Sequence, residues 1–108
     1  MCEWSEWRSF PDPAQLGYLV APLGPGVYEL RNRLTFQLVL VGIGTWCAYR
    51  MSSLLPDGAG TRNNNSKREY VAAHVADIEY RTIACRAKSD AARIERELKR
   101  RCSYLFPT

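Results

Sequence analysis

The chain has 108 residues, 46% of them hydrophobic and 24% charged, which is the composition of one folded domain and excludes a disordered tail. Its longest apolar run, residues 38–49, is too short for a transmembrane helix, which needs about 20 residues. Acidic residues near the N-terminus, where a signal peptide carries bases, indicate a cytoplasmic protein without a membrane segment. We therefore expect a single domain over residues 1–108, with residues 1–23 as an N-terminal extension that packs on it.

The net charge is +4 at pH 7, and the basic residues concentrate between Arg81 and Arg101. Such a segment is either a surface for a polyanionic partner or the solvated face of a helix, and composition leaves both open. The cysteines lie too far apart in sequence for a Cys-x-x-Cys metal or redox motif, so we expect reduced thiols. The glycines form no phosphate-binding fingerprint, so we expect no nucleotide cofactor.

The first 25 residues contain four prolines and are predicted to be irregular, with a short helix over residues 14–19. Alternating apolar residues predict a strand over Val27–Leu30, and β-branched and aromatic residues predict a second strand over Thr35–Val41. With a turn at Arg31–Arg33 between them, these strands should form an antiparallel hairpin. Residues 46–55 then read as a helix.

A polar loop is expected over residues 57–67, followed by a helix over Arg68–Ala76 and a third strand over Ile78–Cys85. Ser89 is the predicted N-cap of a last helix that runs to about Cys102. The predicted fold is a small α/β (α+β) domain with a central three-stranded antiparallel sheet flanked by helices, in the order β-β-α-α-β-α.

Helical spacing separates two glutamates of the last helix. At about 100° per residue, Ala91, Ile94 and Leu98 form one apolar stripe, and Glu95 falls at its margin. Glu97 falls among arginines and should be solvated and paired. A carboxylate that faces the core is costly unless something neutralises it. For Glu95 this leaves two alternatives, a buried ion pair or a divalent metal.

Arg50 poses a similar question, because it stands among apolar residues of the predicted helix 46–55. It can stack against Trp46 or pair with an acid. It can also hold an anionic phosphate oxygen with its forked donors.

Gly26-Val27-Tyr28, followed after eleven residues by Leu40-Val41-Gly42, resembles the paired signature of the GIY-YIG nuclease superfamily. Arg50 stands eight residues after Gly42, at the spacing of that family's arginine. The strand at residues 77–80 and the helix at residues 89–99 are similar to the family's third strand and glutamate helix. The resemblance covers roughly residues 24–108.

The resemblance implies a metal-dependent endonuclease that hydrolyses phosphodiester bonds in DNA with a single Mg²⁺ or Mn²⁺. The family's roles would make Tyr28 the general base, Arg50 the group that binds the scissile phosphate, and Glu95 the metal ligand. The last role agrees with the helical-face argument. A tyrosine needs a nearby cation to act as a base near neutral pH, and Arg31, Arg33 and Arg50 are the candidates.

Three positions depart from the family pattern. Leu40 replaces the tyrosine of the second motif, and Leu54 stands where many members carry histidine or tyrosine. The family's terminal asparagine would fall at Pro107–Thr108, where the chain has none. These departures keep open a non-catalytic nucleic-acid-binding module on the same fold.

Three consecutive asparagines lie among three basic residues within residues 60–68, and such side chains bond phosphates and the edges of nucleobases. The segment is otherwise a plain exposed loop. Together with residues 50–56, it resembles a small stand-alone branch of the family that is specific for single-stranded DNA. The residues expected to contact the DNA strand are Arg62, Asn63, Asn64 and Lys67. The aromatic residues on which its bases are expected to stack are Trp46, Tyr49 and Tyr70. A nuclease for double-stranded or branched DNA is the alternative.

Overall fold

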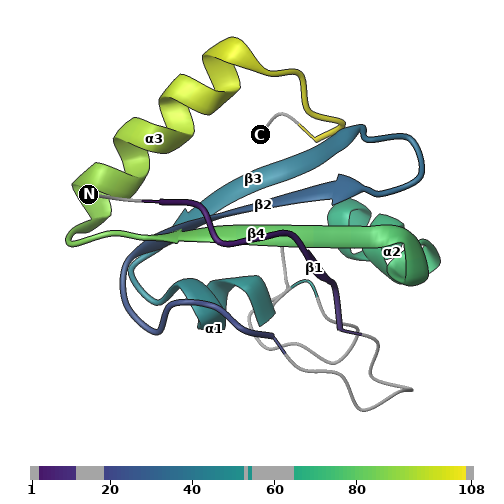
Figure 1. Cartoon of the computed structure of the whole chain (residues 1–108), viewed down its shortest axis with the longest axis horizontal. Helices are drawn as coiled ribbons and strands as arrows, with labels where there is room; N and C mark the ends of the chain where they lie inside the picture. Colours follow the sequence, from purple (N-terminus) through teal and green to yellow (C-terminus); the bar gives the residue numbers. More distant parts are fainter. Residues whose placement is uncertain (1–2, 12–18, 53, 55–64, 107–108) are drawn as a thin grey trace.

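The computed structural model describes residues 3–11, 19–52, 54 and 65–106. Their strands form one antiparallel sheet in the order β1-β4-β2-β3 (Figure 1). The strands are β1 (Arg8–Ser9), β2 (Gly26–Asn32), β3 (Leu38–Gly44) and β4 (Ile78–Ala84). β2 is therefore an inner strand, and β3 is an edge strand.

The helices are α1 (Cys47–Ser52), α2 (Asn65–Ala73) and α3 (Lys88–Arg101), with a 3₁₀ turn, η2 (Val75–Asp77), before β4. The main elements therefore follow the predicted order β-β-α-α-β-α, and the α+β class is confirmed. No helix in the described ranges is long and apolar enough to cross a membrane.

The sheet has one strand more than the predicted three, because the N-terminal extension contributes β1. Arg8 pairs with Tyr80 and Ser9 with Glu79, along the outer side of β4. A two-residue strand shows no alternation that a sequence could reveal. The short helix expected over residues 14–19 falls almost entirely outside the described residues.

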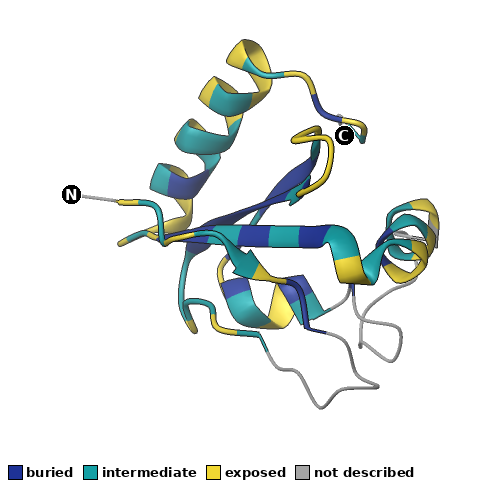
Figure 2. Ribbon diagram, turned by 45° about the vertical axis from the view of Figure 1, so that its right-hand side comes forward, coloured by how far each residue is buried: buried dark blue, intermediate teal, exposed yellow. Residues whose placement is uncertain are grey.

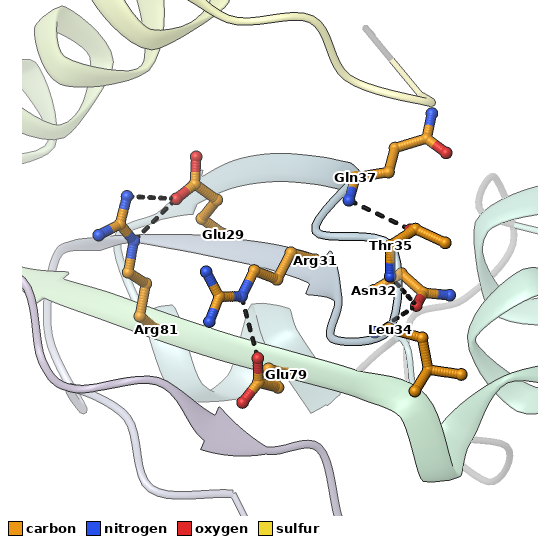
Figure 3. Close-up of polar contacts among 8 residues, drawn as sticks. All are labelled: Glu29, Arg31, Asn32, Leu34, Thr35, Gln37, Glu79 and Arg81. Carbon is orange, nitrogen blue, oxygen red and sulfur yellow. Dashed lines mark hydrogen bonds and ion pairs between the residues drawn. The ribbon is translucent and has the colours of Figure 1, made fainter.

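The hairpin turn lies further along the chain than expected, because β2 continues to Asn32. The Asn32 side-chain oxygen accepts hydrogen bonds from the backbone N–H groups of Leu34, at 2.9 Å, and Thr35, at 3.3 Å (Figure 3). Such a side-chain turn closes the loop without further regular structure. Phe36 completes it with a φ of 60°.

The predicted N-cap of the last helix is wrong. Ala87 is the N-cap in extended conformation, its side chain makes no capping hydrogen bond, and Ser89 is the second helical residue. The backbone N–H of Asp90 donates to the Ala87 carbonyl at 3.1 Å. The first turn therefore closes through the backbone, and sequence preference for a serine cap did not decide the boundary.

The two faces of the sheet carry separate clusters of buried side chains, and α1 and α3 lie on opposite sides of the sheet (Figures 1 and 2). Tyr28 and Leu30 of β2 point to the cluster that includes Met51 of α1 and Val71 of α2. Val27, which alternates with them, points to the cluster that α3 covers. Period-two alternation along β2 thus assigns each side chain to one face.

A buried ion cluster lies on the α3 face, at Glu29, which is 1% exposed. Arg81 donates to its Oε1 from Nε at 2.8 Å and from Nη2 at 2.7 Å (Figure 3), and the Tyr104 hydroxyl donates to its Oε2. The Trp4 ring lies 4.0 Å from the Arg81 guanidinium. Because both carboxylate oxygens are satisfied, this cluster joins the sheet, the C-terminal segment and the N-terminal extension as a structural unit.

Candidate active site

A small pocket of about 150 Å³ opens on the α1 side of β2 and β3. Its lining residues come from β2, β3, α1, α2 and α3, together with Leu54: Tyr28, Leu40, Val41, Gly42, Ile43, Arg50, Leu54, Lys67 and Glu95. The pocket therefore brings together Tyr28, Arg50 and Glu95, which are separated by up to 67 residues in the sequence.

Tyr28 lies over a glycine. It stands directly opposite Gly42 in the register of β2 and β3. A Cβ added at Gly42 would lie 2.3 Å from both Cζ and the hydroxyl oxygen of Tyr28. The phenol ring therefore occupies the space that any larger residue at position 42 would fill.

Two further glycines let α1 approach the sheet. A Cβ at Gly44 would lie 3.0 Å from the Cβ of Arg50, and one at Gly26 would lie 3.2 Å from the Cβ of Cys47. Gly26 and Gly44 are paired across the two strands. The close contact at Gly44 sets the start of the Arg50 side chain, whose guanidinium then reaches Tyr28.

Arg50 supplies the hydrogen bond and positive charge that a basic tyrosine needs, yet burial has the larger effect. Burial raises the pKa of Tyr28 to about 12, against the lowering by Arg50. The other two candidate cations are engaged elsewhere, Arg31 with Glu79 at 2.9 Å and Arg33 with Asp77 at 3.8 Å. Tyr28 is therefore a neutral phenol at ordinary pH, with Arg50 as its cationic neighbour.

Glu95 enters the pocket from α3, on the opposite side of the sheet. Since β3 is an edge strand, a side chain of α3 can reach the other face past that edge. The Glu95 side chain is 21% exposed, and its Oε2 lies 3.5 Å from Nζ of Lys99. The position of Glu95 at the margin of the apolar stripe was predicted. Its ion-pair partner Lys99 was not predicted, although the spacing of four residues between them is visible in the sequence.

Glu97 lies as predicted on the solvated side of α3. Its side chain is 48% exposed, and its Oε1 pairs with Nη2 of Arg100 at 2.5 Å. The hydrogen bond from Arg100 lowers the pKa of this carboxyl. Glu95 and Glu97 are therefore two carboxylates of one helix in different surroundings.

The donor chemistry of the pocket fits a hydrated Mg²⁺ or Mn²⁺. Glu95 supplies a hard carboxylate oxygen, and Mg²⁺ binds through one or two carboxylates while water completes its shell. No cluster of three or more His, Cys, Asp or Glu side chains that could hold a metal occurs among the residues that the structure describes. Glu95 is the carboxylate in the pocket lining and so the residue that would hold such an ion here.

Lys67 lies in the wall of the pocket. From the sequence, we expected it in a loop that contacts the DNA strand. It is the third residue of α2 and is half-buried. Burial, followed by the neighbouring charges of Lys99 and Arg50, lowers the pKa of its ammonium, while Glu95 raises it. The pocket therefore contains a second cation beside Arg50. Its position depends on where α2 begins, which composition alone did not reveal.

Leu40 and Leu54 line the same pocket and are 2% and 1% exposed. At these two positions the resemblance would have supplied polar side chains. Here they form an apolar wall that cannot transfer a proton. Hydrogen bonds and proton transfer in the pocket must therefore come from its other side chains.

Of the predicted stacking residues, Trp46 and Tyr49 are 65% and 62% exposed. The Tyr70 ring instead stacks on His74 at 4.2 Å and contacts Phe106 edge-on at 5.8 Å. We therefore leave Tyr70 out of the proposed DNA contacts. Three of the predicted strand contacts, Arg62, Asn63 and Asn64, lie outside the described residues.

Comparisons of the chain with models of protein families, with curated proteins and with solved structures find no match. Any assignment of function therefore depends on the residues and geometry of the pocket.

Proposed function

We propose that this protein is a DNA endonuclease of the GIY-YIG type, which hydrolyses phosphodiester bonds with Mg²⁺ or Mn²⁺. The observation that carries the proposal is the meeting of Tyr28, Arg50 and Glu95 in one pocket. Their side chains come from β2, α1 and α3. Motif spacing alone does not require that these elements meet, so their convergence supports the resemblance independently.

The pocket suits a phosphate in size and charge. A volume of about 150 Å³ matches a cavity that holds a molecule the size of benzene, so it admits a phosphate group. The forked donors of Arg50 and the ammonium of Lys67 can both address phosphate oxygens. As negative charge develops on the phosphorus oxygens, these fixed cations stabilise it more than they stabilise the ground state.

In this proposal, Tyr28 positions the attacking water and accepts its proton. The hydroxyl is a hydrogen-bond partner of Arg50, so it lies where a bound phosphate would be. With a pKa of about 12, only about one phenol in 10⁴ is ionised at pH 8. The base role therefore predicts a rate that rises with pH over the neutral range.

Glu95 would hold the metal ion, which when bound supplies Lewis-acid stabilisation of the phosphoryl and leaving oxygens. The carboxylate now pairs with Lys99. A cation at Glu95 would compete with that ammonium, and Lys99 would then be available to a second phosphate. The chain itself contributes the carboxylate, the two phosphate-binding cations and the tyrosine hydroxyl.

We test the proposal with one labelled DNA sequence, offered as a single strand and as a blunt duplex, with Mg²⁺, Mn²⁺ or EDTA. Cleavage that needs the metal and is faster on the single strand is the expected result. Equal rates on both forms would make the single-strand preference wrong and leave a nuclease for duplex or branched DNA.

A second candidate is a non-catalytic nucleic-acid-binding module. The apolar wall of Leu40 and Leu54 and the raised pKa of Tyr28 favour it, because both reduce proton transfer in the pocket. Metal-independent binding of DNA without cleavage would support this module and overturn the nuclease.

A further inference from the structure

A second, open pocket of about 420 Å³ adjoins the candidate active site. The two pockets share Ile43 and Arg50. The lining residues of the second pocket are Ile43, Gly44, Thr45, Trp46, Tyr49, Arg50 and Lys88. Its volume lies in the range of small-ligand sites, about 300–1,000 Å³.

We propose that this pocket binds the base of the nucleotide next to the scissile phosphate, and that this nucleotide must be unpaired. The inference rests on the proposed function, because it takes the Arg50 pocket as the phosphate site. It adds a base-binding subsite that selects single strands.

The aromatic side chains support a base as the occupant. Trp46 and Tyr49 stand three residues apart, and the Trp46 carbonyl accepts a hydrogen bond from the Arg50 N–H at 2.9 Å, which makes Trp46 part of the first turn of α1. Residues at this spacing lie on one side of a helix. Two large rings that remain more than 60% exposed beside one pocket offer flat faces, on which any base can stack.

The charges support a nucleotide rather than an apolar ligand. Arg50 lines both the candidate active site and the second pocket. Lys88, the first residue of α3, lines the second pocket. A strand that places one phosphate at Arg50 can place a neighbouring phosphate near Lys88. Lys88 carried no signal in the sequence beyond the general basicity of residues 81–101.

Base pairing decides which form of DNA can use this pocket. In a duplex both faces of each base are covered by its neighbours, and a base must be extruded before a protein can stack on it. In a single strand the face is open at little cost. A phosphate at Arg50 with its base against Trp46 or Tyr49 therefore favours unpaired DNA.

Binding is measured in EDTA, so that cleavage does not contribute, with short labelled oligothymidine and its abasic counterpart. Trp46→Ala should weaken binding of oligothymidine roughly 5- to 150-fold, the range expected from loss of one stacked base. Trp46→Phe should retain most of the affinity, because it keeps a flat face. The matched control is Phe36→Ala, which removes an aromatic side chain of 67% exposure at the hairpin tip.

The abasic strand should bind wild type and Trp46→Ala equally. In a salt titration, Lys88→Ala should reduce the slope of log Kd against log salt by about 0.7. Equal affinity of wild type and Trp46→Ala for oligothymidine would overturn the subsite, and so would an equal loss on the abasic strand. Stacking at Trp46 without any cleavage in Mg²⁺ or Mn²⁺ would instead overturn the nuclease and retain the base-binding pocket.

Discussion

Gly42→Ala should slow cleavage by displacing Tyr28. The added Cβ would lie 2.3 Å from the Tyr28 hydroxyl oxygen, and ordinary contact begins near 3.4 Å. The phenol ring or the strand must therefore move by about 1.1 Å, which is the difference between the two distances. The ring is rigid and buried, so the shift moves the hydroxyl relative to Arg50.

A misplacement of about 1 Å at a reacting group can lower the rate by about 10²-fold. Overpacking of this size costs about 1–3 kcal/mol of folding free energy. For a domain of this length, each kcal/mol corresponds to roughly 4 °C in the melting temperature. Gly42→Ala should thus remain folded at 25 °C while cleaving about 10²-fold more slowly.

Single-turnover cleavage of labelled single-stranded DNA measures the rate, and thermal unfolding followed by circular dichroism measures the stability. Gly24→Ala is the matched control, because a Cβ at Gly24 meets no atom within 4 Å. In a Tyr28→Phe background, Gly42→Ala should add little further loss of rate, since the hydroxyl is already absent. Equal cleavage rates for Gly42→Ala and Gly24→Ala would refute the argument.

Three further predictions concern titration and the buried ion cluster. The wild-type cleavage rate should rise about tenfold per pH unit between pH 7 and 9, because the pKa of Tyr28 is about 12. Tyr28→Phe should be at least ~10²-fold slower and should lack this rise. Matching pH profiles of the two proteins would exclude the base role. Burial raises the pKa values of Cys47 and Tyr28 to about 12, from 9.0 and 10.0. The unfolded chain therefore releases these protons at lower pH than the folded chain, so the free energy of unfolding should fall as pH rises from 9 to 12. Urea titrations at several pH values measure this dependence, and a flat profile would contradict it. Tyr104→Phe removes a donor to the buried Glu29 carboxylate and should cost about 1–3 kcal/mol in urea unfolding, with cleavage unchanged; unchanged stability would contradict the structural role of the cluster.

The three longer strands and the order of the main elements were predictable because they depend on local patterns. Alternation along Val27–Leu30 identified a strand of the sheet, although the strand expected to be central was the next one, which lies at the edge as β3. The apolar stripe of α3 separated Glu95 from Glu97. These patterns reflect the direction of neighbouring side chains, which the chain geometry fixes locally.

Features that depend on contacts between distant segments were missed. β1 is recognisable only through its pairing with β4, and Ala87 caps α3 through its backbone. The place of Lys67 in the pocket depends on the start of α2. The raised pKa of Tyr28 depends on burial, which outweighs the neighbouring Arg50 although a cation near Tyr28 was expected.

Gly42 was likewise predictable in part from a local pattern and in part only from a contact between distant segments. Its sequence position beside Leu40 and Val41 suggested a motif, but spacing gives no reason for a glycine there. The reason is the register of β2 and β3, which sets Tyr28 directly opposite it.

The role of Glu95 as metal ligand is tested by comparing Glu95→Ala with Glu97→Ala in metal-dependent cleavage of single-stranded DNA. Both variants remove one carboxylate from α3, and each leaves a basic partner behind, Lys99 or Arg100. We expect Glu95→Ala to abolish cleavage in Mg²⁺ and Mn²⁺ without unfolding, while Glu97→Ala cleaves as wild type. Equal activity of the two variants, or loss of activity at Glu97 alone, would contradict the assignment of the active site to this pocket.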